Sequence, residues 1–283
     1  MKRVSDEEKR RKFKTLVLDT GVILPGAFNA LTAKLIEEKG FGGVYISGGA
    51  ASASMGFPDI GMFSQTEFVT FASYIVNAIH LPCICDADTG FGDLHQVERT
   101  VRAYEQIGLA GLHIEDQLMP KRCGHLKRKV LISTEEMVLK IEKAVASRQD
   151  PNFLIIARTD ARALEGMSGA IDRAKAYTAA GADLIFPEAL QSKEEFEGFA
   201  LEMDPPLMAN MTEFGVSPLI PAQSLIDMGY KIVIFPVSSL RIAMKAVDSF
   251  FDHLKTDGTQ KGQLEHMQTR KDLYDLLDYS SEE

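Results

Sequence analysis

The sequence lacks the features that mark secreted, membrane-spanning and nucleic-acid-binding proteins. Its 283 residues include three cysteines, Cys83, Cys85 and Cys123, which is too few for a disulfide framework and favours a reducing compartment. The first fifteen residues hold no apolar stretch of the kind found in secretory signals, and no apolar run approaches the ~18 residues that a membrane span requires. Asp and Glu outnumber Lys and Arg by 40 to 31, whereas nucleic-acid binders carry a basic excess. We therefore expect a cytoplasmic protein that binds neither membranes nor nucleic acid.

The composition is that of a folded chain with a large core. Hydrophobic residues make up 45% of the sequence and charged residues 25%, a balance typical of globular proteins. The length lies near the upper end for one domain, and low-complexity stretches, long linkers and visible repeats are absent. We predict a single domain over residues 1–283, with a charged N-terminal arm at 1–15 and a helical segment at about 255–283.

Short apolar runs alternate with helical patterns along most of the chain. Eight runs have the length and composition of strands: 22–24, 44–47, 83–87, 111–114, 154–157, 184–186, 207–209 and 232–235. Several helices between them end in glycine, such as Gly108 and Gly181, because glycine adopts the left-handed conformation that closes a helix. Eight strands, each followed by a helix or long loop, predict an α/β fold, a (β/α)8 TIM-type barrel. The rival is a doubly wound sheet, whose dinucleotide-binding form would show a GxGxxG motif that is absent here.

Nearly every predicted strand leads directly into polar or charged residues. Those that follow the strands are Ser47, Gly48, Gly49, Asp86, Asp88, Glu115, Arg158, Glu188, Asn210 and Thr212. Barrel enzymes build their active sites from the carboxyl ends of several strands. Loops are polar in any protein, but specific carboxylates and an arginine at the strand boundary favour an enzyme.

The segment DADTGFG, residues 86–92, has the character of a metal site. Side chains two apart on a strand share a face, so Asp86 and Asp88 can point the same way if the strand continues that far. Two carboxylates beside a glycine-rich loop suit Mg²⁺, which prefers oxygen ligands and retains waters. Glu115 and Glu188 could complete the site directly or through water. The same carboxylates could instead cap helices or pair with arginines.

The three cysteines differ in their surroundings. Cys83 and Cys85 alternate with aspartates on a predicted strand, and without nearby histidines they are predicted to be core residues rather than zinc ligands. Cys123 lies in the segment PKRCGHLKRK, whose positive charge would favour the thiolate and attract an anionic substrate. Cys123 is therefore a candidate nucleophile or general acid. The alternative is a solvated basic loop with an incidental cysteine.

Three arginines and a tyrosine complete the candidates. Arg158 directly follows the apolar run FLIIA. Together with Arg241 and Arg270 it would suit a polycarboxylate, because arginine binds carboxylates in a bidentate fork. By position alone, Arg241 and Arg270 are equally consistent with solvated helix residues. Tyr45 shares a strand face with Ser47 and is either an acid or base, or a core residue with a satisfied hydroxyl.

Seven segments together resemble the isocitrate lyase and phosphoenolpyruvate mutase superfamily. They are YISGG, DADTGFG, GLHIEDQ, KRCGH, ARTDA, FPEA and NMTEFG, and the resemblance covers about residues 21–279. The segments GTQK and MQTR near the C-terminus are similar to those of the methylisocitrate lyases in this superfamily. The sequence after His125 departs from the Arg-Pro that often follows it in those enzymes, so the resemblance identifies the type of reaction better than the substrate.

The resemblance implies a barrel whose terminal helix is exchanged between subunits of a homotetramer, a dimer of dimers. It implies Mg²⁺, with Mn²⁺ as a substitute, bound by Asp86 and Asp88 and by Glu115 directly or through water. Cys123 matches the catalytic cysteine of these enzymes. The residues implied in substrate binding are Ser47, Gly48, Gly49, Cys123, Gly124, Arg158, Glu188, Asn210, Met211, Thr212, Arg241 and Arg270.

The expected reaction is a magnesium-assisted retro-aldol or Claisen-type cleavage of 2-methylisocitrate, a small tricarboxylate, to pyruvate and succinate in propionate catabolism by the methylcitrate cycle. Tyr45 or a metal-linked carboxylate would accept the hydroxyl proton, and Cys123 would protonate the carbanion. The alternatives are a sister lyase acting on 2,3-dimethylmalate or another 2-alkylmalate, an oxaloacetate decarboxylase or phosphoenolpyruvate mutase, and a catalytically silent carboxylate-binding barrel. The loop cysteine argues against the mutases and decarboxylases, which generally lack it.

Overall fold

Eight parallel strands form the centre of the computed structural model, which describes residues 4–122, 124–125 and 128–280. In the sheet they follow the order β1-β8-β7-β6-β5-β4-β3-β2. The two end strands, β1 and β2, adjoin where the Ala27 amide donates to the Tyr45 carbonyl over 2.9 Å, so the sheet is a nearly closed barrel. The strands are β1 (Val22–Pro25), β2 (Val44–Ile46), β3 (Cys83–Asp86), β4 (Gly111–Glu115), β5 (Leu154–Thr159), β6 (Leu184–Pro187), β7 (Leu207–Asn210) and β8 (Tyr230–Phe235). The predicted (β/α)8 barrel is confirmed, with each strand within two residues of its expected ends.

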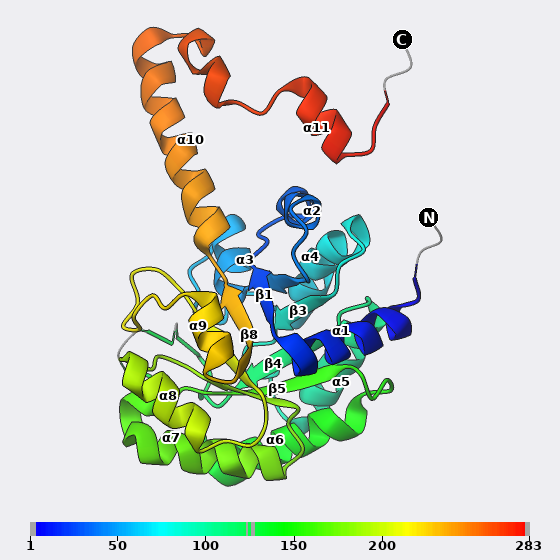
Figure 1. Ribbon diagram of the computed structural model, residues 1–283, viewed down its shortest axis with the longest axis vertical. Coiled ribbons are helices and arrows are strands. Elements are labelled where there is room, and N and C mark those ends of the chain that lie inside the picture. Colours follow the sequence, from blue (N-terminus) through cyan, green and yellow to red (C-terminus); the bar gives the residue numbers. More distant parts are fainter. Residues whose placement is uncertain (1–3, 123, 126–127, 281–283) are drawn as a thin grey trace.

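Helices alternate with the strands, and all but the C-terminal ones pack around the barrel (Figure 1). Ser64 and Ser133 begin two of them with capping boxes, in which a serine and a glutamate satisfy backbone amides of the first turn. The helices are α1 (Asp6–Thr20), α2 (Ala30–Glu38), α3 (Gly48–Ser54), α4 (Gln65–Ala78), α5 (Leu94–Gln106), α6 (Thr134–Ser147), α7 (Arg162–Ala179), α8 (Lys193–Leu201), α9 (Ala222–Asp227), α10 (Ser238–Asp257), the 3-10 helix η1 (Lys261–His266) and α11 (Arg270–Leu276).

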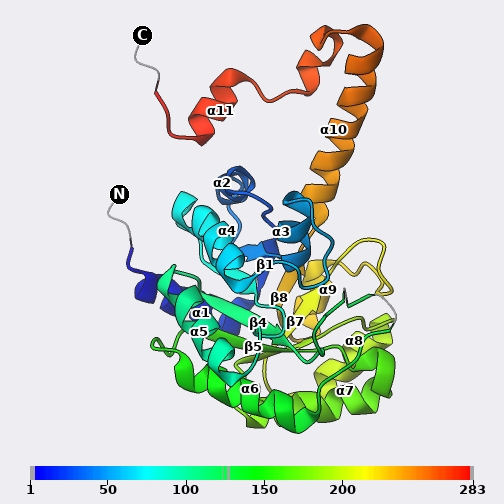
Figure 2. The ribbon, with the colours of Figure 1, turned by 180° about the vertical axis from the view of Figure 1, so that it is seen from behind.

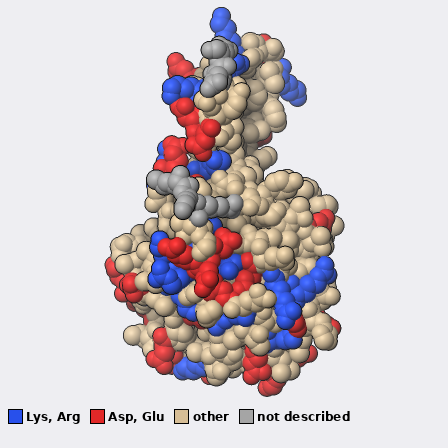
Figure 3. Space-filling model, turned by 90° about the vertical axis from the view of Figure 1, so that its right-hand side faces the viewer, with Lys and Arg blue, Asp and Glu red and all other residues tan. Residues whose placement is uncertain are grey.

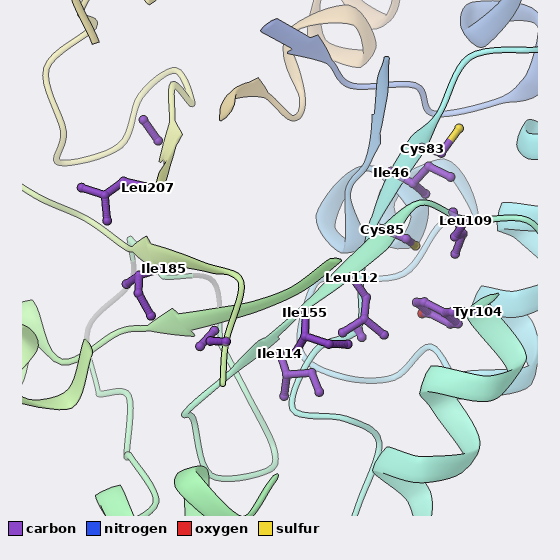
Figure 4. Close-up of a cluster of buried hydrophobic side chains, with 14 of the residues drawn as sticks. Ile46, Cys83, Cys85, Tyr104, Leu109, Leu112, Ile114, Ile155, Ile185 and Leu207 are labelled. Atoms are coloured by element: carbon purple, nitrogen blue, oxygen red, sulfur yellow. The ribbon is translucent and has the colours of Figure 1, made fainter. Parts of the chain in front are cut away.

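Strand alternation divides the core into two layers. Side chains on one strand face, such as Ile84 of β3, belong to the cluster inside the barrel. Their neighbours Cys83 and Cys85 belong to the larger cluster between strands and helices, where Figure 4 shows them with Tyr104 of α5. Both cysteines are free and buried, so their prediction as core residues is confirmed. Because the barrel is buried on both faces, its strands read as nearly continuous apolar runs.

Helix α1 covers the amino ends of the strands. Its Phe13 and Val17 belong to the inner cluster of the barrel. Arg10 is buried, and its Nε donates to the Leu109 carbonyl just before β4 over 2.7 Å. This end of the barrel is therefore sealed, and the opposite end, where the carboxyl ends of the strands lie, remains for a site.

The C-terminal helices form an arm that projects from the barrel (Figures 1 and 2). Every residue of α10 is at least partly exposed, including the large apolar side chains of Ile242 and Phe251, which are 73% and 59% exposed. The chain then turns back, and Asp278 beyond α11 lies 3.6 Å from Lys34 of α2.

The surface carries charges of both signs. On the face seen in Figure 3, acidic side chains gather near the middle of the molecule, with basic side chains on either side. Among the helices that the structure describes, none combines the length and the apolarity needed to cross a membrane.

Candidate active site

A pocket of about 400 Å³ opens at the carboxyl ends of the strands. Its described lining includes ten of the residues predicted for the site: Tyr45, Ser47, Gly49, Asp86, Gly124, Arg158, Glu188, Asn210, Thr212 and Arg241. They come from five strands or the segments that follow them, from the segment after β4 and from α10. The structure thus brings together groups that lie up to about 200 residues apart in the sequence, as the strand-end pattern predicts.

Five other predicted residues take different positions. Asp88 and Glu115 are buried beside the pocket, and the Gly48 amide donates to Asp86 Oδ2 over 3.1 Å. Met211 is buried behind the lining, where its sulfur accepts a hydrogen bond from the Ile220 amide over 3.3 Å. Arg270 begins α11 in the projecting arm and is exposed. Cys123 lies outside the described residues.

Arg158 is the central cation of the pocket. Its Nε lies 3.0 Å from Asp160 Oδ2 and 3.3 Å from Glu115 Oε2, and its Nη2 lies 3.4 Å from Glu188 Oε2. Burial alone would lower the pKa of Arg158, but these carboxylates raise it well above its ordinary value. The guanidinium therefore stays charged in a buried position, where an anion has little competition from water.

His125 joins the basic segment after β4 to the far side of the pocket. Its Nε2 lies 3.0 Å from Glu188 Oε1, and its Nδ1 accepts a hydrogen bond from the Val216 amide over 3.2 Å. Burial alone would raise the pKa of Glu188, but Arg158 and His125 lower it below its ordinary value. Glu188 is therefore a carboxylate at neutral pH, held by the Arg158 guanidinium and the His125 imidazole.

Asp86 and Asp88 lie close together because of a backbone turn that the sequence does not predict. Strand β3 ends at Asp86, and Asp88 has a φ of 45°, so a turn rather than strand alternation joins them. The Asp88 amide donates to Asp86 Oδ1 over 2.9 Å. Lys121 Nζ lies 2.7 Å from Asp88 Oδ1 and also pairs with Asp59.

These carboxylates fit a Mg²⁺ ion held by few protein ligands and several waters. Burial raises the pKa of Asp88 to about 7 and raises the pKa of Glu115 as well, so a nearby divalent cation would stabilise both carboxylates. Among the described residues, Glu115 Oε1 has no hydrogen-bond partner, and no three His, Cys, Asp or Glu side chains are grouped as direct metal ligands. Mg²⁺ commonly uses one or two carboxylates and keeps its waters.

Tyr45 contacts a histidine that the sequence analysis missed. Its hydroxyl lies 2.6 Å from His113 Nε2 inside the barrel. Burial, together with Asp86, raises the pKa of Tyr45 well above its ordinary value, and burial lowers the pKa of His113 to about 4. At neutral pH the tyrosine therefore keeps its proton and the histidine is neutral.

Two further residues of the site carried weak sequence signals. Asp59 lines the pocket from the loop between α3 and α4, away from any strand end, so the strand-end rule could not find it. His113 lies in the middle of β4, two residues before Glu115 and on the same strand face. The alternation within GLHIED could have placed it inside the barrel.

Comparisons with known proteins agree with this architecture. The family model described as phosphoenolpyruvate phosphomutase matches residues 13–255. A 2-methylisocitrate lyase from Aeropyrum pernix is 50% identical over 258 residues, which cover 91% of this chain and 83% of the relative. The crystal structure of a 2,3-dimethylmalate lyase superposes with a TM-score of 0.90 at 34% identity, covering 97% of this chain and 92% of the other. A phosphonopyruvate hydrolase solved with oxalate and Mg²⁺ gives 0.85 at 29% identity, with 97% and 95% covered.

The fold and the pocket define an α/β-barrel enzyme that handles small carboxylates. The chain belongs to the phosphoenolpyruvate mutase and isocitrate lyase superfamily.

Proposed function

We propose that this protein is a carbon–carbon lyase that cleaves 2-methylisocitrate to pyruvate and succinate. The observation that carries the proposal is Arg158, a buried cation within 3.4 Å of Glu115, Asp160 and Glu188 at the floor of the pocket. Arginine in such a position binds carboxylate oxygens in a fixed fork. The 50% identity to a 2-methylisocitrate lyase selects this substrate among the small carboxylates.

Asp86 and Asp88 are the residues that would hold Mg²⁺, with Glu115 bound directly or through water. When bound, the ion would lower the pKa of the substrate hydroxyl and stabilise the charge of the adjacent carboxylate. The phosphonopyruvate hydrolase structure with oxalate and Mg²⁺ supports this use of the barrel. Because the raised pKa of Asp88 implies a protonated fraction near neutral pH, we expect Mg²⁺ binding to weaken as the pH falls below about 7.

The chain's own residues would then perform the proton transfers. A carboxylate of the Asp86, Asp88 and Glu115 cluster accepts the hydroxyl proton, since the raised pKa of Tyr45 makes its phenol a donor rather than a base. The new C=O bond forms as the C–C bond breaks, which releases pyruvate and leaves the electron pair on the succinate carbon. Cys123 gives its proton to that carbon as general acid.

The remaining basic side chains would stabilise the charge that develops on the succinate half. Arg158, His125 and Arg241 all line the pocket. Charged donors that are already oriented contribute much of the rate enhancement of such reactions, because no reorganisation is needed when the charge appears. Ser47, Gly49, Asn210 and Thr212 would orient the substrate's polar ends.

A second substrate class has support from the neighbouring structures. The 2,3-dimethylmalate lyase shares the fold at a TM-score of 0.90. A dimethylmalate has one carboxylate fewer than methylisocitrate, so it makes less use of Arg241 at the mouth of the pocket.

The test is to follow pyruvate release from threo-2-methylisocitrate with a coupled dehydrogenase in the presence of Mg²⁺. Parallel reactions contain isocitrate, 2,3-dimethylmalate and oxaloacetate. Rapid release from methylisocitrate that stops on adding EDTA and returns with Mg²⁺ supports the proposal. Turnover of 2,3-dimethylmalate alone would show that the protein is a dimethylmalate lyase instead. Binding of these compounds without turnover of any of them would contradict lyase activity.

The projecting arm supports a homotetramer in which terminal helices are exchanged. Five large apolar residues of α10 are 38% to 73% exposed and are of the kind that subunit interfaces cover: Ile242, Met244, Val247, Phe251 and Leu254. Arg270 could reach a pocket only through such an exchange, because it lies on the arm. A cytoplasmic location stays a prediction.

A further inference from the structure

Lys129 has a buried position that the proposed reaction does not explain. Its ammonium donates to Asp160 Oδ1 over 2.9 Å and also to the Gly124 carbonyl. Only 5% of the residue is exposed. A buried lysine costs free energy unless its charge and its donors are satisfied. Of the two partners of Lys129, Gly124 lines the pocket and Asp160 is a buried partner of Arg158.

Asp160, which directly follows β5, is held in place by several hydrogen bonds. Its side chain is fully buried and also accepts from Arg158 Nε over 3.0 Å. Its backbone amide donates to Asp116 Oδ1 over 2.9 Å, and Asp116 is held in turn by the hydroxyls of Thr159 and Tyr177. The carboxylate that receives Lys129 is therefore anchored to the barrel from behind.

Gly124 lies in close contact with the same groups. A Cβ atom on Gly124 would lie 2.5 Å from Arg158 Nη2, 2.5 Å from Glu188 Cγ and 2.8 Å from Asp160 Oδ1. The backbone at this position thus touches the central cation of the pocket. In the chain, Gly124 is bonded directly to Cys123.

From these contacts we propose that Lys129 is a positioning residue, which ties the Gly124 carbonyl to Asp160 and so holds Gly124, the chain neighbour of Cys123, beside Arg158. The inference rests on the proposed function. Lys129 is not expected to touch the substrate. It acts through Gly124, and a misplacement of about 1 Å in a reacting group can cost about 100-fold in rate.

The test compares Lys129→Met, which keeps the length of the side chain but removes the charge, with Lys129→Arg, which keeps the charge. Lys9→Met is the matched control, because Lys9 is also a buried lysine but lies on α1 at the opposite end of the barrel. We expect Lys129→Met to lower kcat by about 100-fold, with KM changed less than about threefold. Lys129→Arg should recover at least about a tenth of the wild-type kcat. Lys9→Met should keep the wild-type kcat.

A second measurement reports on the tether without any activity. Residues 121–129 contain several trypsin sites, so we expect cleavage within this segment to be about tenfold faster in Lys129→Met than in the wild type, and unchanged in Lys9→Met. If wild-type protein releases no pyruvate, the proposed function fails while this measurement still tests the tether. Equal cleavage rates, or a kcat within twofold of wild type, would overturn the positioning role.

A double variant distinguishes a Lys129 that acts through Asp160 from a Lys129 that only adds positive charge to the site. If Lys129 acts through Asp160, Lys129→Met combined with Asp160→Asn should be no slower than the slower single variant. Multiplied losses would show that the two residues act independently, and the proposal would be abandoned. Should Lys129→Met fail to fold, Lys129→Gln, which keeps a donor without the charge, takes its place in both measurements.

Discussion

At the scale of single residues, the pocket combines charges that would be unstable apart. Arg158 is buried among three carboxylates, and the attraction between these opposite charges offsets the free-energy cost of removing each of them from water. The sequence indicated Arg158, Glu115 and Glu188 because each stands at a strand end. It could not indicate Asp59, which a loop brings into the pocket, nor that Asp88 turns back onto Asp86 with a positive φ.

The residue with the most direct predicted role in the chemistry is Cys123. Replacing it with serine should lower kcat by at least about 100-fold, the contribution typical of a general acid, while substrate binding is retained. Steady-state pyruvate release gives kcat, and calorimetric titration gives the affinity. Cys83→Ala serves as the control, because Cys83 is buried on the helix-facing side of β3. A Cys123→Ser enzyme with near-normal turnover would remove the thiol from the mechanism.

Glu188 gives the protein a dependence of stability on pH. Its pKa in the folded chain lies below the ordinary value of 4.5, so the unfolded chain binds this proton more readily. The contribution is fully present above about pH 4.5 and is lost as the pH falls below it. Glu188→Gln should therefore flatten the rise of unfolding free energy with pH between about 3 and 5, by at most about 1.4 kcal/mol per pH unit. Denaturant titrations at several pH values measure the slope, and parallel curves for the two proteins would contradict the assignment.

At the scale of elements, the strands and the helical character of the C-terminal segment were predictable, whereas the direction of the arm was not. Each strand is short, apolar and buried on both faces, so its pattern is local and the eight runs could be read directly. The direction in which α10 leaves the barrel depends on contacts with other parts of the molecule. Its sequence is amphipathic whether the helix packs on the barrel or projects from it, so the pattern alone does not distinguish the two arrangements. The family resemblance implied that Arg270 binds the substrate. In this chain, however, Arg270 lies on α11 in the arm, away from the pocket.

Helix α1 stabilises the barrel at the end opposite the pocket. Arg10 donates to the Leu109 carbonyl and pairs with Asp150 over 3.4 Å, and both ends of the pair are buried. Arg10→Met should lower the free energy of unfolding by about 3 kcal/mol, because it leaves a buried carboxylate without its partner. Arg11→Met, one position along and exposed, should change it by less than about 0.5 kcal/mol. Chemical denaturation measures both, and kcat should be unchanged in each; equal stabilities would show that Arg10 is not a structural anchor.

At the scale of the whole molecule, the arm is the part that a single chain leaves uncovered. Phe251 is 59% exposed midway along the outer part of α10. If subunits cover this face, Phe251→Asp should break the tetramer into smaller species, since a buried charge would face an apolar interface. His253→Asp, an exposed neighbour on the same helix, should leave the mass unchanged. Light scattering coupled to gel filtration gives the mass, and a Phe251→Asp protein that remains a tetramer would exclude this face from the interface.

The helix that forms the arm also forms part of the pocket. Leu240, Arg241 and Met244, in its first two turns, line the pocket, and the same continuous helix runs on to Asp257, about 30 Å in all. Because the helix is continuous, a displacement of its far end would also move the residues that line the pocket. If subunits assemble through the arm, the placement of this pocket wall would therefore depend on how firmly the partner subunits hold the arm.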